Sequence, residues 1–381
     1  MKHLSIITLL TLTLTGLASG RAVTEGEMRK AKSFTVSKGG TLDMSINSGD
    51  IRITTWEKNE VAVSFESSDD EDENSDVKMS QQGNTIRITD RDSWGNDERF
   101  EISIPSQFNL KLETSNGDIS VRGKLTGTID GETSAGNIKL NDVDGSVEMR
   151  TSGGDIRAGK ITGKGSLATS GGEIEISSCT EELDLKSSGG DIRVGNVGKS
   201  LRAKTAGGDV VIGDVGGEAI ASTAGGNVKV GKVSGQATLN TAGGDVELSG
   251  GNGTIRASTS GGNIMLTNLS GSVEAKTSGG DIHAELAPSG KGKSRLASSN
   301  GTIKLYLPET AKATITARIR IQGWWRSQQD EYTIHSDFKE DSSERDEDER
   351  ELRATYNLNG GGEVITLETV NSDIEIRKLK K

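Results

Sequence analysis

The sequence has very few cysteines and histidines, the residues that form disulfide bonds and contribute to many metal-binding and catalytic sites. Its 381 residues include 1 cysteine and 3 histidines. Cys179 cannot form a disulfide within the chain, so the fold must be stabilised by packing and hydrogen bonds. His283 and His335 lie far apart in the chain, and neither belongs to a Ser-His-Asp, Cys-His or metal-ligand motif. We therefore expect a protein that is not an enzyme, with no catalytic residue, no cofactor and no metal ion.

Proline and aromatic residues are also scarce. The chain has 3 prolines, 4 tryptophans, 3 tyrosines and 5 phenylalanines, and its apolar content is 31%. A compact globule of this length would carry more large apolar groups, whereas a disordered chain would lack the regular spacing described below. No aromatic residue lies between positions 109 and 305, which argues against a sugar-binding platform of ring faces there.

Positive charge is in deficit, and long apolar runs are confined to the start of the chain. The formal net charge of -11 argues against nucleic acid and anionic membranes as partners. Lys2 and His3 precede an apolar run over residues 4–17, which small residues follow. This is the layout of a secretory signal peptide over residues 1–20, and the run is shorter than the roughly 20 residues that span a bilayer. We expect an exported protein, periplasmic or at the cell surface, with no integral membrane segment in the mature chain.

Glycine, by contrast, is abundant and periodic. The tag Thr-Ser/Ala-Gly-Gly-Asp/Asn/Glu-Ile/Val recurs every 18 residues. A less regular copy precedes the series, and another follows it near Thr302. A fixed period of this kind identifies a structural repeat. The polar position of the tag, which we name the turn ladder, is occupied by Asp118, Asn137, Asp155, Glu173, Asp191, Asp209, Asn227, Asp245, Asn263 and Asp281.

One repeat, residues 191–208, shows what each unit does. Apolar and charged residues alternate over 192–194 and again over 201–205, which predicts two short strands with one buried face each. The five or so small and medium-sized apolar side chains of one repeat cannot form a core alone, but stacked repeats can share one core. At roughly 4.8 Å between strands, about ten coils give a rod on the order of 50 Å long. We predict an all-β protein: a single elongated β-solenoid, β-helix-like, with 18-residue coils and β-rich end caps. A flattened coil with two faces is favoured over a triangular one.

The domain organisation follows from the limits of the repeat. We expect an N-terminal β cap with the first irregular coils over residues 21–109, the regular solenoid over 110–305, and a C-terminal β cap with an acidic loop over 306–381. The acidic tracts at 67–76 and 340–351 match the ligand spacing of no known calcium loop, so we interpret both as solvated loops.

The repeated tags and both ends of the chain resemble a known family. The opening stretch 34–53 ends in Asn-Ser-Gly-Asp-Ile, and the closing stretch combines 334–338, an acidic spacer, 358–362 and 371–376. Together they resemble the bacterial putative-adhesin domain family, a group of β-solenoid domains of largely unknown function. The resemblance covers nearly all of the mature chain. It implies an exported, non-enzymatic, adhesin-like role at the cell envelope, and it supplies no catalytic residue.

Three sets of side chains invite a functional interpretation. The turn ladder could hold cations or a ligand, but we interpret its side chains as caps that accept hydrogen bonds from nearby backbone N–H groups. A column of threonines falls on the same alternating positions as the inward apolar residues. We therefore expect buried hydroxyl groups and not an ice-binding array. Cys179 occupies the column of Val197 and Val233 and is expected to be a small core residue. The members of the threonine column are Thr151, Thr169, Ser187, Thr205, Thr223, Thr241, Thr259 and Thr277.

Trp324 and Trp325 are the sharpest candidates for contact with a ligand, although capping of the last coil explains them as well. Taken together, the sequence favours a non-catalytic, exported, adhesin-like structural or binding module of the bacterial cell envelope. Its partner would be an unidentified protein or glycan of the envelope or surface. Two alternatives stay open: a polysaccharide-active β-helix enzyme that uses carboxylates in a cap, for example Asp337, and an envelope-stress regulatory partner protein.

Overall fold

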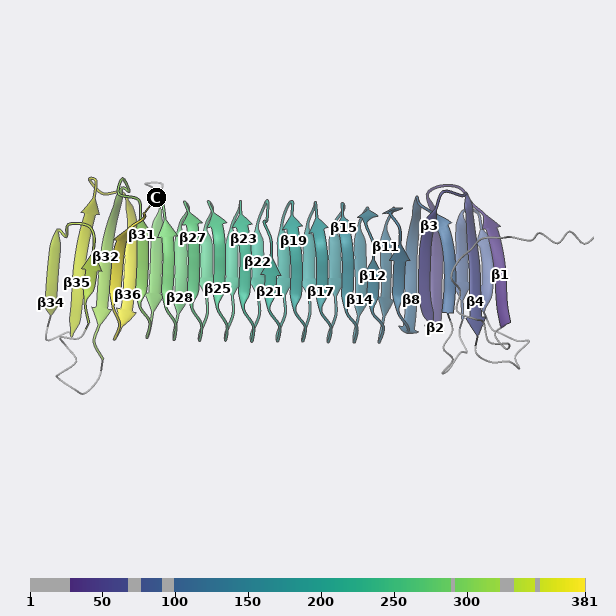
Figure 1. The fold of residues 1–381 in the computed structure, drawn as a ribbon, viewed down its shortest axis with the longest axis horizontal. Helices are drawn as coiled ribbons and strands as arrows, with labels where there is room; N and C mark the ends of the chain where they lie inside the picture. Colours follow the sequence, from purple (N-terminus) through teal and green to yellow (C-terminus); the bar gives the residue numbers. More distant parts are fainter. Residues whose placement is uncertain are drawn as a thin grey trace, which may run out of the picture.

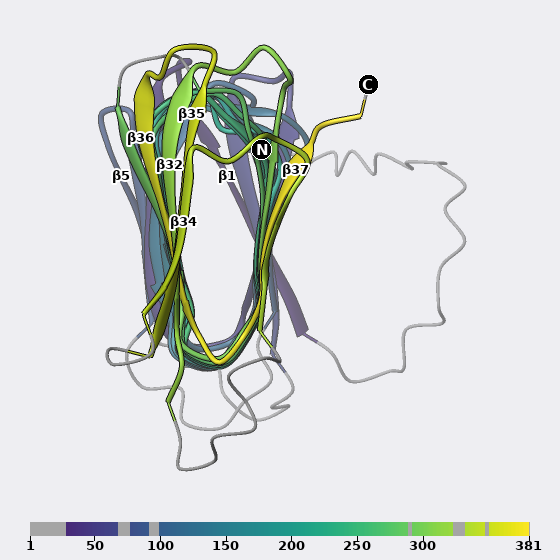
Figure 2. The same cartoon turned by 90° about the vertical axis from the view of Figure 1, so that its left-hand side faces the viewer.

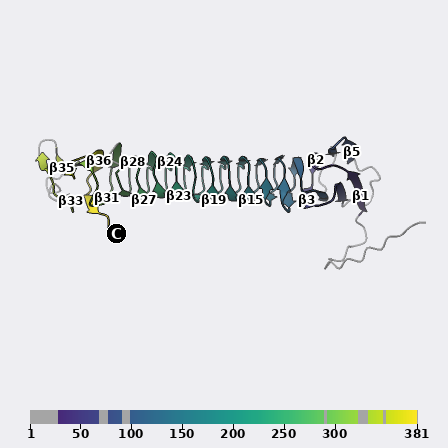
Figure 3. The same cartoon turned by 90° about the horizontal axis from the view of Figure 1, so that it is seen from above.

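The fold is a long, narrow rod built from β-strands. The computed structural model describes residues 28–67, 77–90, 99–288, 292–322, 332–346 and 350–380. Within these ranges all regular structure is β, in 37 strands that stack along one axis (Figure 1). Seen along that axis, the strands superpose as two facing walls (Figure 2), and seen from above they form two rows (Figure 3). The predicted all-β solenoid with a flattened, two-faced coil is confirmed.

The first wall, sheet A, has 17 strands in a continuous order, and two short strands extend it. In spatial order the strands are β1 (Met28–Thr35), β4 (Glu60–Ser67), β7 (Arg99–Pro105), β3 (Asp50–Trp56), β9 (Ile119–Arg122), β12 (Ile138–Leu140), β15 (Ile156–Ile161), β17 (Ile174–Cys179), β19 (Ile192–Val197), β21 (Val210–Ile212), β23 (Val228–Val233), β25 (Val246–Gly251), β27 (Ile264–Leu269), β29 (Ile282–Leu286), β31 (Ile303–Leu307), β37 (Ile374–Lys378) and β33 (Ile334–Ser336). The short strands are β10 (Leu125–Thr126) and β13 (Val143–Asp144).

The second wall, sheet B, has 18 strands. In spatial order they are β5 (Lys78–Gln82), β6 (Thr85–Thr89), β2 (Gly40–Ser48), β8 (Phe108–Asn116), β11 (Ile129–Thr133), β14 (Val147–Thr151), β16 (Gly165–Ala168), β18 (Leu183–Lys186), β20 (Leu201–Lys204), β22 (Ala219–Ser222), β24 (Ala237–Asn240), β26 (Ile255–Ser258), β28 (Val273–Thr277), β30 (Lys293–Ser298), β36 (Glu363–Val370), β32 (Ala313–Arg320), β35 (Glu351–Leu358) and β34 (Ser342–Asp346).

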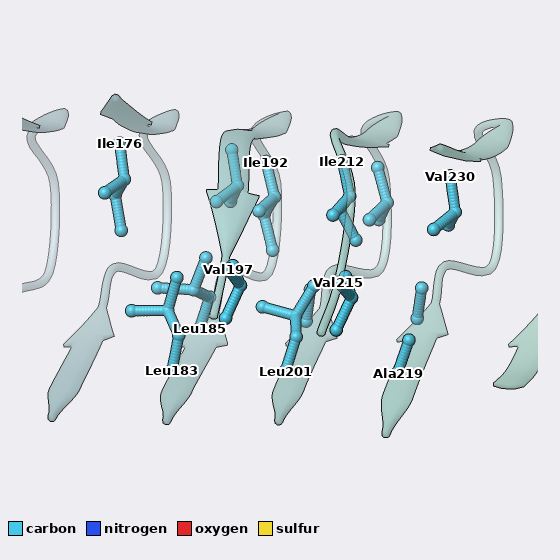
Figure 4. Packing of buried hydrophobic residues seen from close by; sticks show 14 of the residues in the cluster. Ile176, Leu183, Leu185, Ile192, Val197, Leu201, Ile212, Val215, Ala219 and Val230 are labelled. Carbon is cyan, nitrogen blue, oxygen red and sulfur yellow. The ribbon is translucent and has the colours of Figure 1, made fainter. Parts of the chain in front are cut away.

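Each regular coil contributes one strand to each wall and pairs in parallel with the next coil. Ile192 lies beside Val210, and Leu201 lies beside Ala219, so the register of both walls equals the period of the sequence repeat. The core between the walls is one column of inward side chains, shown for the central coils in Figure 4. Ile192 and Ala219 are fully buried there. Burial of a branched aliphatic side chain contributes about 1.5–3 kcal/mol, and every coil shares this interior with its two neighbours.

The glycine pair of each tag is explained by the close approach of successive turns. A Cβ on Gly172, the second glycine of its pair, would lie 2.1 Å from the carbonyl oxygen of Gly154 in the preceding coil. A Cβ on the first glycine, Gly171, would lie 3.3 Å from the carbonyl oxygen of Gly153. Space between the coils, and not a left-handed backbone, therefore requires the second glycine.

Both ends of the rod depart from chain order. At the N-terminal end β2 lies between β6 and β8, and β3 lies between β7 and β9. At the C-terminal end β36 lies between β30 and β32, and β37 lies between β31 and β33. Antiparallel strands then close the stack: β1 and β5 at one end, β35 and β34 at the other. The first coil is therefore intercalated between strands from later in the chain, and the last coil between strands from earlier in the chain.

Candidate binding surfaces of the rod

The turn ladder runs along one edge of the rod as a chain of hydrogen bonds between coils. The backbone N–H of Asn227 donates to Oδ1 of Asp209 at 2.7 Å, and the N–H of Asp209 donates to Oδ1 of Asp191 at 2.8 Å. The same bond joins the other successive members of the ladder except Glu173 and Asp191. One side-chain oxygen of each bonded member is thus already an acceptor within the protein. Each of these side chains except that of Glu173 caps the following coil, which is more specific than the expected bond to a nearby backbone N–H group.

The ladder changes at Glu173 and continues past both of its predicted ends. Oε2 of Glu173 lies 3.3 Å from the guanidinium of Arg193, since the longer side chain reaches the outer face. Asp50 accepts from the N–H of Asp118, and Asp281 accepts from the N–H of Thr302. No group of three or more Asp, Glu, His or Cys residues in the described ranges is placed to hold a metal ion.

The threonine column lies inside the rod, and its hydroxyl groups join successive coils. Oγ1 of Thr169 donates to the carbonyl oxygen of Gly154 at 2.8 Å and accepts from the N–H of Gly172 at 3.2 Å. Its exposed fraction is 5%, and the other members are buried as well. A buried hydroxyl with both partners satisfied costs little, so the column stabilises the turn and offers no surface to a ligand.

Cys179 lies in the core, in register with Val197. Its Sγ contacts the carbonyl oxygen of Gly163 at 3.3 Å. Burial raises the pKa of the thiol above its ordinary value, which disfavours the nucleophilic thiolate.

His283, His335 and Asp337 lie on the outer face of sheet A toward the C-terminal end. The ring of His283 packs on Tyr306 with 4.7 Å between centroids, and Nε2 of His335 lies 2.8 Å from Oγ1 of Thr333. Asp337 accepts the N–H of Lys378 at 3.0 Å and pairs with Arg377 at 3.1 Å. The N–H of Lys378 and then Arg377 hold the pKa of Asp337 below its ordinary value, so this carboxylate is suited to joining the end of β37 and not to donating a proton.

A groove of about 620 Å³ runs along the edge of sheet B across several coils. Its lining includes Gly165, where neighbouring coils carry larger inward residues, and the pair Lys164–Glu182 at 2.9 Å. The hydrogen bond between these two side chains raises the pKa of Lys164 and lowers that of Glu182, so both stay charged. Oδ1 of Asp184, which also lines the groove, is enclosed and has no hydrogen-bond partner among the described residues. This groove was not predicted from the sequence, although Gly165 in an apolar column marks it.

Trp324 and Trp325, the candidate contact residues, lie outside the described residues, as do residues 1–20. Their suggested role stays a prediction. Near them in the chain, Tyr332 and Phe338 are partly buried and pack against the core.

The fold and its ladders define a β-solenoid of stacked coils with two long outer faces. The chain belongs to the family described as Toastrack DUF4097, which matches residues 40–213 and again residues 199–377. This family match confirms the resemblance to the bacterial putative-adhesin domain family. Two consecutive matches fit a solenoid extended by whole coils, since each coil contacts only its neighbours.

Several solved structures are similar over most of their length, at low identity. A putative adhesin from Parabacteroides distasonis is 14% identical, with 64% of this chain and 96% of that chain covered and a TM-score of 0.31. A putative adhesin from Bacteroides fragilis is 13% identical, with 92% and 97% covered and a TM-score of 0.24. A putative cell adhesion protein from Clostridium sporogenes is 10% identical, with 93% and 100% covered and a TM-score of 0.18. No curated protein matches the chain.

Proposed function

We propose that the chain is an exported, non-catalytic, adhesin-like binding rod of the bacterial cell envelope. The observation that carries this proposal is the unbroken register of the coils. From β11 to β28 every strand of sheet B pairs with the equivalent strand of the next repeat, with no inserted loop. Such a stack holds outward side chains at a repeat of about 4.8 Å, which suits the recognition of an extended partner.

Membership of the Toastrack family supports an adhesin-like role in place of an enzymatic one. We propose that residues 1–20 direct export, that caps over 21–109 and 306–381 close a regular solenoid over 110–305, and that the partner is a protein or glycan of the envelope or surface. Within the described ranges, no helix is long and apolar enough to cross a bilayer.

The test is localisation combined with binding. Cells that express the full chain are fractionated, and intact cells are treated with a protease to which only surface proteins are accessible. The purified rod is then incubated with envelope fractions. Recovery of the chain in the periplasm or at the surface, together with saturable binding, supports the proposal. A chain that stays in the cytoplasm, or one that releases reducing ends in a broad glycan screen, overturns it.

A further inference from the structure

A small basic pocket lies on the outer face of sheet B near the C-terminal end of the rod. Its volume is about 180 Å³, and its lining includes Lys276, Arg295, Arg318 and Arg320 with one carboxylate, that of Glu368. The local formal charge is therefore +3 in a chain whose net charge is -11. Charge of one sign concentrated in a hollow attracts ligands of the opposite sign.

The register of the strands explains why these side chains converge. Ala297 of β30 lies between Lys276 of β28 and Glu368 of β36, and Arg318 of β32 lies beyond Glu368. Neighbouring strands are about 4.8 Å apart, so the short side chain of Ala297 leaves a hollow among longer ones. Arg295 precedes Ala297 by two residues on the same face of β30. The intercalated strand β36 supplies Glu368, Thr369 and Val370 to the lining.

The cations of the pocket are only partly neutralised. Arg295 pairs with Glu368 at 2.5 Å, and Arg318 pairs with Glu351 at 3.1 Å. Lys276 and Arg320 are exposed and form no ion pair with any described residue. A guanidinium has five N–H donors in a planar fork, so a single ion pair leaves donors for a second oxyanion.

The size of the pocket limits what it can hold. A volume of 180 Å³ corresponds to roughly six water molecules, enough for one oxyanion group and part of its carrier. A membrane surface would need a wide basic face, yet Glu274 and Glu351 flank the pocket and the net charge of the chain opposes anionic lipid. A narrow polymer with spaced acidic groups needs no wide basic face, because one acidic group can enter the pocket, and salt screens the groups further away from the negative charge of the rest of the chain.

We propose that this pocket binds an oxyanion group, a carboxylate or a sulfate ester, on an acidic polysaccharide. The inference deepens the proposed function, because it names the class of partner that the rod recognises and the place where it does so. Arg295, Arg318 and Arg320 supply forked donors to the oxyanion, Lys276 adds a point charge, and Glu368 competes with the ligand for Arg295.

The test compares two double variants of the full chain by titration with heparin and with polygalacturonate. K276A/R320A removes two pocket cations. K186A/K204A removes the same charge from the same face, since Lys186, Lys204 and Lys276 share one outward column and both control residues lie at least four coils away. We expect at least a tenfold loss of affinity for the pocket variant and less than twofold for the control, with neutral dextran unbound. Glu368→Gln should raise affinity about threefold or more, a gain that a merely structural residue would not produce.

Other results overturn the inference. Equal losses in the two double variants would show diffuse electrostatic attraction, and stronger binding to phosphatidylglycerol vesicles than to either polymer would indicate a membrane site. Inorganic phosphate that competes at equal concentration of anionic groups would show a site for free anions. If envelope fractions bind the wild type and K276A/R320A equally well, the pocket proposal fails while the binding rod stands. If neither the wild type nor K276A/R320A binds envelope material, but K276A/R320A loses affinity for heparin while the control variant does not, the pocket proposal stands and the rod proposal fails.

Discussion

The hydroxyl of Thr369 donates a hydrogen bond of 2.8 Å to the carbonyl oxygen of Gly301, 68 residues earlier in the chain. In the regular coils the same contact joins residues only 15 apart, as between Thr277 and Gly262. The last coil thus occupies the position that the next coil in sequence would otherwise take. The strands at residues 313–320 and 334–336 are displaced outward, one place further from the centre of the rod.

We predict that this intercalation locks the C-terminal end. A chain ended after Leu358 lacks β36 and β37, so β30 and β32 lose the strand that they share. We expect a fall in melting temperature on the order of 10 °C, monitored by far-UV circular dichroism. The control deletes one regular coil, residues 192–209, which should shorten the rod by about 4.8 Å in X-ray scattering and change the melting temperature far less. Equal melting of the truncated and full chains would show that the last coil is dispensable.

The coils could be predicted from sequence because their information is local. Apolar alternation around a glycine tag determines which side chains face inward, and the constant period of the tag brings equivalent positions into register. The parity of Thr169 predicted its burial, and the column of Cys179 predicted its place in the core. Both follow from one repeat and its neighbour.

The intercalated ends and the basic pocket could not be predicted in this way. The alternation of apolar and polar residues in β36 would be the same if this strand lay beyond β32 and not between β30 and β32. The local pattern therefore does not determine which coils are neighbours. Lys276 and Arg295 lie on neighbouring strands in chain order, whereas Glu368 lies between this pair and Arg318 only because the last coil is inserted between β30 and β32. The acceptor role of the turn ladder was expected from the sequence, but its donor was not specified, because the bonded N–H belongs to the next coil.

The second glycine of each tag should tolerate substitution less well than the first. A Cβ at Gly154 would lie 2.1 Å from the carbonyl oxygen of Gly136, whereas a Cβ at Gly153 would lie 3.4 Å from the carbonyl oxygen of Ala135. We expect Gly154→Ala to lower the free energy of unfolding by about 1–3 kcal/mol or more, because two backbones must separate. Gly153→Ala serves as the matched control and should cost much less in urea titrations. A reversed order would mean that backbone conformation, and not contact between coils, selects the glycine.

Removal of a buried hydroxyl from the threonine column should destabilise the rod. Thr169→Val keeps the shape but leaves the carbonyl oxygen of Gly154 and the N–H of Gly172 without their partner. The expected cost is about 1–3 kcal/mol in the free energy of unfolding. Thr169→Ser retains both hydrogen bonds, as Ser187 does in its own coil, and should cost less. If valine and serine have the same effect in denaturant titrations, the hydroxyl has no stabilising role.

Replacement of a carboxylate by an amide in the turn ladder should leave the stability of the rod unchanged. Asp209→Asn preserves an oxygen that accepts the N–H of Asn227, and Asn occupies this position naturally in three regular coils. Asp209→Ala removes the acceptor and should cost about 1 kcal/mol. Thermal melts with and without a calcium chelator complete the test. Destabilisation of the asparagine variant, or a fall in melting temperature caused by the chelator, would indicate that the ladder holds cations.

The link between Asp337 and the end of β37 should be sensitive to acid. The N–H of Lys378 and the guanidinium of Arg377 hold the pKa of Asp337 below its ordinary value, so the folded state favours the ionised carboxylate. Its contribution to stability is present above the unfolded pKa of about 3.9 and disappears as the pH falls through the lower folded pKa. Asp337→Asn should therefore be less stable than the wild type near neutral pH, and the difference should vanish in strong acid. Melting temperatures of both proteins, measured from neutral pH to strong acid, test whether the stability difference decreases as the pH falls. The control is Asp130→Asn, at a carboxylate that forms no ion pair with the described residues. A constant difference between wild type and Asp337→Asn down to the lowest pH would show that shape, and not charge, explains the role of Asp337.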